Sequence, residues 1–179
     1  SYEESVTLAR LEEVPVVSIA AIIQHNSSGF ASITSKGIES PKDFESMKYG
    51  GWGSPIENAM IQALVEQDGG DFSKVEILTS GATDFFASSE NDIDFAWIFE
   101  GWTGIEAKQK GIELNYVDLG KEEAALDYYT PVIITNEANI NDNEELVDTA
   151  SFQIFNCEGM FLDWSGPSST EGKVVVQYD

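Results

Sequence analysis

Residues 48–70 read KYGGWGSPIENAMIQALVEQDGG and combine a strand end, a glycine-rich loop, a helix and a stop signal. Ser54 can cap the helix, Pro55 fits its first position, and Glu57 completes a capping box. Helical spacing then predicts one buried face made of Ile56, Met60, Ala63 and Leu64. This stretch therefore predicts a βα unit, in which a strand leads directly into a helix.

The glycine-rich loop before the helix is the first candidate for a binding site. Gly50, Gly51 and Gly53 allow the backbone to approach a ligand closely. Free N–H groups at a helix start favour an acceptor or an anion. Trp52 lies among the glycines and could form an aromatic wall at the carboxyl end of a strand, where open α/β sheets bind ligands. An ordinary βα turn with a glycine hinge is the alternative.

Composition limits the classes of protein to which the chain can belong. Its 179 residues, 42% of them hydrophobic, are enough for one globular domain, alone or with an appendage. The formal net charge of -23 opposes binding to nucleic acid or to an anionic membrane surface. We interpret this charge as a solvated surface, with attraction of a cationic partner as the alternative. We see no membrane-spanning run and no signal peptide, and a chain that starts at Ser1 without methionine suits a mature or trimmed form.

Few residues have the side chains that catalysis or metal binding requires. Cys157 is the only cysteine and His25 the only histidine, so these two are the only residues that could form a catalytic Cys–His pair. The sequence contains no nucleophile elbow, phosphate-binding loop, GxGxxG motif or metal-ligand spacing. We therefore predict no catalytic residue, no metal and no cofactor, and expect a small-molecule binding pocket of aromatic and polar residues.

Helices and strands are expected to alternate along the chain. Strands are expected at 16–23, buried on both faces, and at 30–33, 75–79, 93–99, 114–119, 128–135 and 173–178. Helices are expected at 1–14, after the turn at 38–44, and at 55–68, 84–89, 105–110 and 143–155. This order predicts an α/β fold with a mostly parallel sheet flanked by helices.

Further candidate binding residues follow the predicted strands. Glu100 could accept two hydrogen bonds from an amino-substituted nitrogen heterocycle, although a solvated loop glutamate is an equal alternative. Trp102, like Trp52, could stack on a flat ring, whereas Trp97 lies inside a strand and is expected in the core. The polar run 24–29 could form the rim of a cleft, with a simple turn as the alternative.

Two adjacent tyrosines and two residues near the chain end complete the candidates. Tyr128 and Tyr129 would point to opposite faces of a strand, so only one of them is expected to face a cleft. Cys157 and Met160 are expected to be packing residues.

Four segments resemble the thiamine-precursor substrate-binding proteins of bacterial ABC importers, a group related to the sulfonate-type binding proteins and to the fungal pyrimidine synthase. They are IAAIIQHNSSGFAS (19–32), GIESPKDFESMKYGGWGSPIE (37–57), DFAWIFEGWTGIEAKQKGIELNY (94–116) and LDYYTPVIITNE (126–137). The resemblance covers about residues 1–148. It implies a type 2 periplasmic-binding-protein fold, in which two α/β lobes hold hydroxymethylpyrimidine or formylaminopyrimidine relatives in the cleft between them.

The resemblance also implies which residues bind the ligand. The matching motifs are the QHN, GWGS, FEGW and YYTP segments. They assign ligand-binding roles to Asn26, Trp52, Gly53, Ser54, Glu100, Trp102 and Tyr128 or Tyr129.

The chain departs from the family pattern at both ends. The family's opening strand with its LDW motif does not precede Ser1, and residues 161–164, FLDW, echo that motif without its continuation. We therefore expect mainly one lobe. Residues 1–14 would end the first lobe, 15–136 would form the second-lobe α/β domain, and 137–179 would form a C-terminal helix and an unassigned tail. An uncovered cleft face in such a chain predicts self-association, a partner chain or weak binding.

The favoured hypothesis is a solute-binding component of an ABC importer that binds an aminopyrimidine precursor of thiamine without changing it. Its partners would be the importer's membrane subunits. It would be extracellular, either periplasmic or anchored to the membrane as a lipoprotein. One alternative is an enzyme resembling the pyrimidine synthase that uses His25, although this chain lacks that group's cysteine-rich motif and a lysine in the obvious pocket loops. The other is a truncated lobe that acts as an interaction module.

Overall fold

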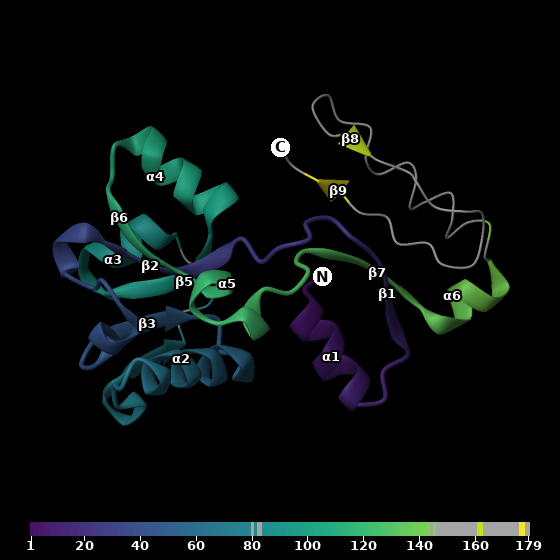
Figure 1. Ribbon diagram of the computed structural model, residues 1–179, viewed down its shortest axis with the longest axis horizontal. Coiled ribbons are helices and arrows are strands. Elements are labelled where there is room, and N and C mark those ends of the chain that lie inside the picture. Colours follow the sequence, from purple (N-terminus) through teal and green to yellow (C-terminus); the bar gives the residue numbers. More distant parts are fainter. Residues whose placement is uncertain (80, 82–83, 144, 146–160, 163–175, 178–179) are drawn as a thin grey trace. The chain divides into compact units, whose positions relative to one another are not determined.

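The computed structural model describes residues 1–79, 81, 84–143, 145, 161–162 and 176–177 (Figure 1). The chain divides into two compact units. Unit 1 combines Ser1–Asn26 with Asp127–Asp179, and unit 2 is Ser27–Leu126. The lobe boundaries expected after residues 14 and 136 stay a prediction.

Unit 2 is built on a five-stranded sheet with the strand order β4-β3-β5-β2-β6. The strands are β2 Ser28–Ile33, β3 Lys48–Gly51, β4 Glu76–Thr79, β5 Phe95–Phe99 and β6 Leu114–Asp118. Strand β3 runs parallel to β4 and β5, whereas β2 runs antiparallel to β5 and β6. The sheet is therefore mixed, with β2 opposed to the other four strands, and the α/β class is as expected.

Helices lie on both sides of this sheet, with α2 on one side and α4 on the other (Figure 1). The α-helices are α2 Pro55–Gln67, α3 Phe85–Asn91, α4 Ile105–Lys110 and α5 Leu119–Glu122. The 3₁₀ turns are η1 Thr34–Lys36, η2 Pro41–Phe44, η3 Phe72–Lys74 and η5 Ala124–Leu126, and η4 Glu100–Gly104 is a π-helical turn. The capping boxes expected at η2 and α2 are both present, which fixes where each element begins.

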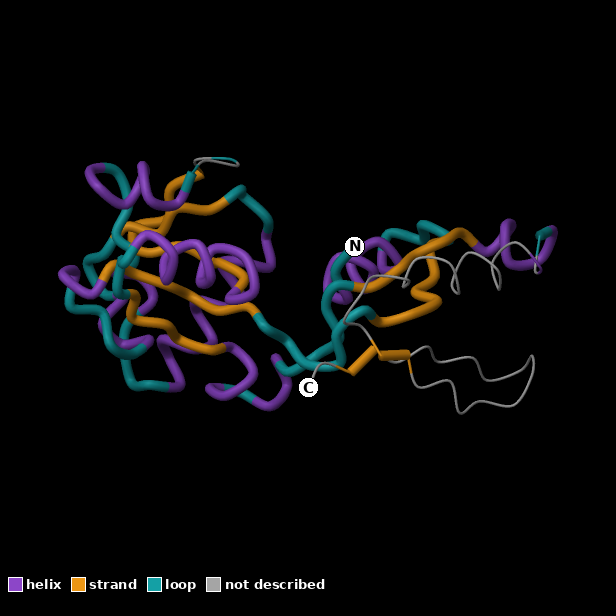
Figure 2. The backbone as a smooth tube through the Cα atoms, turned by 90° about the horizontal axis from the view of Figure 1, so that it is seen from above, coloured by secondary structure: helices purple, strands orange, loops and turns teal. Residues whose placement is uncertain are grey.

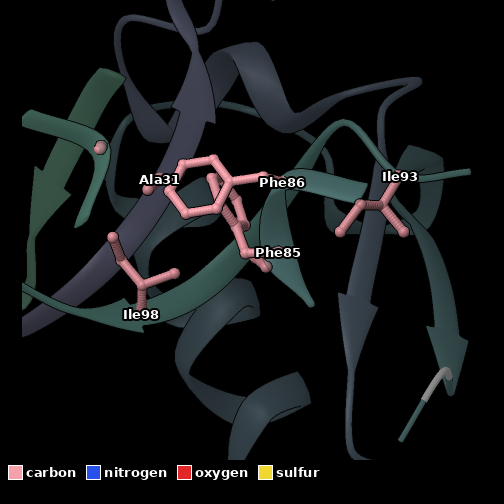
Figure 3. Packing of buried hydrophobic residues seen from close by; sticks show 7 residues of the cluster. Ala31, Phe85, Phe86, Ile93 and Ile98 are labelled. Atoms are coloured by element: carbon pink, nitrogen blue, oxygen red, sulfur yellow. The ribbon is translucent and has the colours of Figure 1, made fainter. Parts of the chain in front are cut away.

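The two faces of the sheet bury different side chains. On the face that carries α2, the Phe30 ring meets Phe44 and Tyr49 edge to face, and Phe44 stacks on Phe95 with ring centroids 4.1 Å apart. The opposite face holds a cluster under α3 and α4 (Figure 3). Its buried members are Ala31, Phe85, Phe86, Ile93, Ala96, Ile98 and Ala107. Both faces are covered by apolar side chains, so the sheet can support the loops at its strand ends.

The buried face of α2 differs from the predicted one. We expected Ile56, Met60, Ala63 and Leu64, but Ala63 is exposed and Ile56 is only partly buried. The residues that the helix buries are Glu57, Met60, Ile61, Leu64 and Val65. The apolar run offers two overlapping helical stripes, and a hydrogen bond between Glu57 and Tyr49 of β3 turns the helix toward the second of them.

The described part of unit 1 is smaller. It contains α1 Glu3–Leu11, β1 Val16–Ala21, β7 Val132–Asn136 and α6 Glu137–Asp142, with the short strands β8 Phe161–Leu162 and β9 Val176–Gln177. Strands β1 and β7 form an antiparallel two-stranded sheet (orange in Figure 2). The expected burial of 16–23 on both faces is wrong, since in β1 only Ala20 and Ala21 are buried. Among the described residues β1 pairs with β7 alone, and a two-stranded sheet buries few of its side chains.

Two further helix and strand predictions for unit 1 differ from the elements of the structure. The strand expected at 128–135 begins only at Val132, so Tyr128 and Tyr129 precede it and do not alternate across a strand. The helix that follows is α6, whereas the helix expected at 143–155 lies almost entirely outside the described residues. Cys157, Met160, Trp164 and most of the strand expected at 173–178 also lie outside them.

Candidate ligand-binding site

The loop that joins β3 to α2 is organised by the carboxylate of Glu57. This side chain is buried, and its Oε2 accepts hydrogen bonds from the Tyr49 hydroxyl at 2.7 Å and the Trp52 backbone N–H at 3.1 Å. Its Oε1 accepts from the Ser54 backbone N–H at 2.5 Å. We expected free N–H groups at the helix start to favour an acceptor, but the Ser54 N–H is bonded to Glu57 and the Ile56 N–H to the Ser54 hydroxyl. Burial and the bond to Glu57 together raise the pKa of Tyr49 far above its ordinary value.

The glycines of this loop are required largely by the protein's own packing. A Cβ at Gly50 would lie 2.6 Å from Ile93, and one at Gly51 would collide with the Glu57 carboxylate. Gly53 has a φ of 93°, a conformation that favours glycine, and a Cβ there would lie 2.9 Å from Thr79. Gly50 and Gly51 thus lie close to Ile93 and Glu57, and their approach to a ligand stays a prediction.

The side chain of Trp52 extends from this loop and stacks on Trp97 of β5. The two ring centroids are 5.4 Å apart and the ring planes are inclined by 26°. Trp97 is 6% exposed and belongs to the core as expected, whereas Trp52 is 47% exposed. A buried indole therefore supports a half-exposed one, which leaves part of the Trp52 surface available for contact.

A hollow of about 330 Å³ in unit 2, here called the indole hollow, contains Trp52, Trp97 and Trp102 in its wall. Trp102 is 78% exposed and lies in the π-helical turn η4. The remaining wall residues are Gly50, Gly81, Asp84, Phe85, Phe86, Ile93, Ala96, Ile98, Thr103 and Glu106. Its size is at the lower end of the range for small-molecule sites, and flat aromatic walls suit a planar ligand.

Two carboxylates line the indole hollow. Asp84 caps α3 by accepting from the Ala87 N–H at 2.8 Å. Glu106 pairs with Lys110 at 2.7 Å, and the Lys110 ammonium also lies 4.2 Å from the centre of the Phe86 ring. Lys110 itself is not part of the wall of the hollow. The charged groups that line the hollow are therefore negative.

Glu100 lies in a different hollow from the one we expected. It lines a larger concavity of about 730 Å³, here called the α4 hollow, together with Lys108 and Tyr116. The Lys108 ammonium lies 3.4 Å from the Glu100 carboxylate, and the Tyr116 hydroxyl donates to the Ser27 carbonyl at 3.1 Å. Burial, followed by the nearby Asp118 carboxylate, raises the pKa of Tyr116. Trp52 and Trp102 thus share a hollow that Glu100 does not line.

The other candidate residues have separate positions. Ser54 acts as the N-cap of α2, and neither it nor Gly53 lines the indole hollow. Asn26, Tyr128 and Tyr129 belong to unit 1. Asn26 is buried and Tyr129 is 43% exposed. Their part in ligand binding stays a prediction.

His25 and Asp127 are joined by a hydrogen bond in unit 1. The His25 Nδ1 lies 2.8 Å from Asp127 Oδ2, and the Asn26 backbone N–H donates to Asp127 Oδ1 at 2.9 Å. The hydrogen bond with His25 is the main reason why the pKa of Asp127 is lowered. Within the described ranges, no group of three His, Cys, Asp or Glu side chains could hold a metal ion. In the part of the chain that can be described, no helix is long and apolar enough to cross a membrane.

The sequence analysis did not assign a role at the glycine loop or the indole hollow to three acidic residues. Glu57 was recognised only as a cap, although a capping-box glutamate behind a glycine loop can also bind that loop's N–H groups. Glu106 lies in the first turn of α4, just after the π-helical turn that holds Trp102, so α-helical spacing did not connect the two side chains. Asp84 was assigned as a cap without a second role.

Comparison with solved structures identifies the class of protein to which the fold belongs. The fold is similar to that of the periplasmic aliphatic sulphonate binding protein SsuA from Escherichia coli, with a TM-score of 0.58 and 14% identity, over 79% of this chain and 45% of that protein. It is also similar to the desulfurization enzyme DSZB, with a TM-score of 0.50 and 13% identity, over 74% of this chain and 52% of that protein. The fold is therefore that of a periplasmic binding protein, matched over about half of its length.

Residues 1–151 match the family described as NMT1/THI5 like, and the chain belongs to this family. The formylaminopyrimidine-binding protein of Halalkalibacterium halodurans is 26% identical over 153 residues, which are 82% of this chain and 44% of that protein. The chain thus spans about half the length of this curated relative. These matches confirm the resemblance that the four sequence segments indicated.

Proposed function

We propose that this protein is the solute-binding component of an ABC importer and that it binds an aminopyrimidine precursor of thiamine without changing it chemically. The observation that carries the proposal is the indole hollow, in which Trp52 rests on Trp97 and shares the wall with Trp102. Membership of the NMT1/THI5-like family and the 26% identical formylaminopyrimidine-binding protein support the same ligand class.

The charge of the hollow distinguishes between candidate ligands. An anionic sulfonate would meet the Asp84 and Glu106 carboxylates, and no described residue contributes a cation to the wall, in a chain of net charge -23. An aminopyrimidine is planar, and its exocyclic amine can donate a hydrogen bond to a carboxylate. We therefore expect aminopyrimidines to bind and alkanesulfonates not to bind.

Isothermal titration calorimetry of the full chain tests the proposal. Formylaminopyrimidine and hydroxymethylpyrimidine are titrated, with an alkanesulfonate as the negative control. Trp52→Ala and Trp102→Ala should each weaken binding about tenfold, because each removes a stacking surface worth roughly 1 kcal/mol or more. Ile105→Ala is the matched control, since Ile105 is exposed, follows Trp102 by three residues and does not line the hollow. No heat with any aminopyrimidine, for folded protein, would overturn the proposal.

The carboxylate that pairs with the ligand is identified by three amide variants. Family resemblance favours Glu100, which pairs with Lys108 in the α4 hollow, whereas Asp84 and Glu106 line the indole hollow. Asp84→Asn keeps a good helix cap, so its effect on binding reports the lost charge rather than a lost cap. Glu100→Gln and Glu106→Gln complete the set, and Glu90→Gln on the exposed side of α3 is the control. The variant that weakens binding most identifies the partner.

Binding without reaction is a separate part of the proposal. Among the relatives compared, two are named as binding proteins and one as an enzyme. Mass spectrometry of an aminopyrimidine recovered after long incubation with the chain should return the compound unchanged. A pyrimidine product whose formation needs His25 would instead support the synthase-like alternative.

The proposed partners are the membrane subunits of the importer, and the proposed location is outside the cytoplasmic membrane. Self-association is a further element of the proposal. Sedimentation at several concentrations distinguishes a monomer from an associating chain. An obligate oligomer that takes up no aminopyrimidine would favour the interaction-module alternative.

A further inference from the structure

Glu57 lies behind the proposed binding surface and does not contribute to its wall. It is 1% exposed, and each of its carboxylate oxygens is bonded. The Tyr49 hydroxyl ties the carboxylate to β3, while the Trp52 and Ser54 N–H groups tie the loop to the carboxylate. Hydrogen bonds to a charged acceptor in a buried place are among the stronger ones in proteins.

These bonds define the path of the loop at the residue that carries the exposed indole. A bond at the Trp52 N–H fixes the backbone from which its side chain projects, and the bond at Ser54 fixes the start of α2 two residues later. Gly51 leaves no room for a Cβ beside the same carboxylate, so the loop is packed directly against Glu57.

We propose that Glu57 is the positioning residue that holds Trp52 in its stacked orientation on Trp97, ready to receive a planar ligand. The inference about Trp52 stands on geometry alone, and its consequence for affinity rests on the proposed function. Glu57 acts through the loop backbone and does not itself contact the ligand.

Glu57→Gln tests this role with little change of volume. An amide group replaces one carboxylate oxygen, so either Trp52 or Ser54 must direct its N–H toward an NH₂ group, which cannot accept. Stacked indoles couple their electronic transitions and give a circular dichroism couplet, which Trp52→Phe should abolish. We expect Glu57→Gln to lose most of this couplet without ligand and to raise the Kd for an aminopyrimidine about tenfold or more.

Tyr49→Phe separates positioning from stability. It removes one donor to Glu57 but leaves both backbone N–H bonds, so it should lower the midpoint of unfolding while keeping the couplet. If Tyr49→Phe and Glu57→Gln lose the couplet in proportion to their loss of stability, Glu57 is only a structural residue and the inference fails.

Hydrogen exchange in the unaltered chain supplies a measurement that needs no variant. The Trp52 and Ser54 amide hydrogens should exchange with solvent as slowly as those of β3, and more slowly than the exposed Gly101 amide hydrogen. Fast exchange at both would overturn the inference even if Glu57→Gln did not fold. Failure of the unaltered chain to bind any aminopyrimidine would remove the proposed function but leave the couplet and exchange results valid.

Discussion

The indole of Trp97 supports the indole of Trp52, with centroids 5.4 Å apart and planes inclined by 26°. One partner is 6% exposed and the other 47% exposed. The buried ring also lies 6.0 Å from Phe30, so its position is set by the sheet's core. The exposed surface of Trp52 is thereby held by packing that continues into the interior.

Truncation of the buried indole of Trp97 and of the exposed indole of Trp102 should therefore have unequal costs. Trp97→Ala removes a buried aromatic side chain and should lower the free energy of unfolding by about 3–5 kcal/mol. Trp102→Ala removes an indole that is 78% exposed and should cost less than about 1 kcal/mol. Urea unfolding followed by far-ultraviolet circular dichroism measures both. Equal losses would show that Trp97 is not the packed support described here.

The glycine loop provides a matched pair of alanine variants. Gly51→Ala should lower stability by about 2 kcal/mol or more, because its Cβ collides with the Glu57 carboxylate. Gly101→Ala has no atom within 4 Å of the new Cβ and no positive φ, so it should change stability by less than about 0.5 kcal/mol. Thermal unfolding of both variants is the measurement. Similar melting temperatures for the two would contradict the packing assigned to Gly51.

Alkaline pH should destabilise the fold through Tyr49. Its folded-state pKa is raised, mainly by burial, above the value of about 10 expected in the unfolded chain. Below about pH 10 the Tyr49 hydroxyl keeps its proton in both states, and its contribution to the free energy of unfolding is complete. As the pH rises further, Tyr49 loses this proton in the unfolded chain first, so the free energy of unfolding falls. Chemical unfolding between about pH 9 and pH 11 should show a shallower decline in Tyr49→Phe. Part of the decline should remain, since the pKa values of Tyr116 and Tyr128 are raised in the same direction.

The pKa of Asp127 should report on its hydrogen bond with His25. The hydrogen bond with His25 holds the pKa of the Asp127 carboxyl below its ordinary value. Asp127 therefore stabilises the folded state when the pH is above that ordinary value. This stabilisation is lost as the pH falls through the folded-state pKa. In His25→Gln the Asp127 pKa should move up toward the ordinary value. Carbon-detected NMR titration of the side-chain carboxyl measures it, with Asp68, whose pKa is lowered by other partners, as the internal control. An unchanged Asp127 pKa would contradict the pairing.

The sequence was sufficient for features that depend on local chemistry. Capping residues and glycines located α2, and Asp84 located the start of α3, because these signals act within one turn. The antiparallel direction of β2 was not predicted, since strand direction depends on partners distant in the chain. The rotation of α2 was also missed, because the pairing of Glu57 with Tyr49 becomes visible only once the helix lies on the sheet.

The predictions for the candidate site also differ in how far local sequence signals could support them. Trp52 and Trp102 were expected to stack on a flat ring, and the structure places both in the wall of the indole hollow. Glu100 was expected beside them, but strand ends specify only a region of the sheet edge, and the side chain points to Lys108 and the α4 hollow. Pairing with Lys108 could not be read from periodicity across a π-helical turn, whose residue spacing differs from that of an α-helix.

The most direct test of the central claim is an NMR titration of the full chain with formylaminopyrimidine, observing the indole N–H signals of its four tryptophans. The Trp52 and Trp102 signals, assigned with Trp52→Phe and Trp102→Phe, should shift together and saturate, and an alkanesulfonate should shift neither. If both signals stay unchanged in folded protein at saturating pyrimidine, the indole hollow is not the binding site.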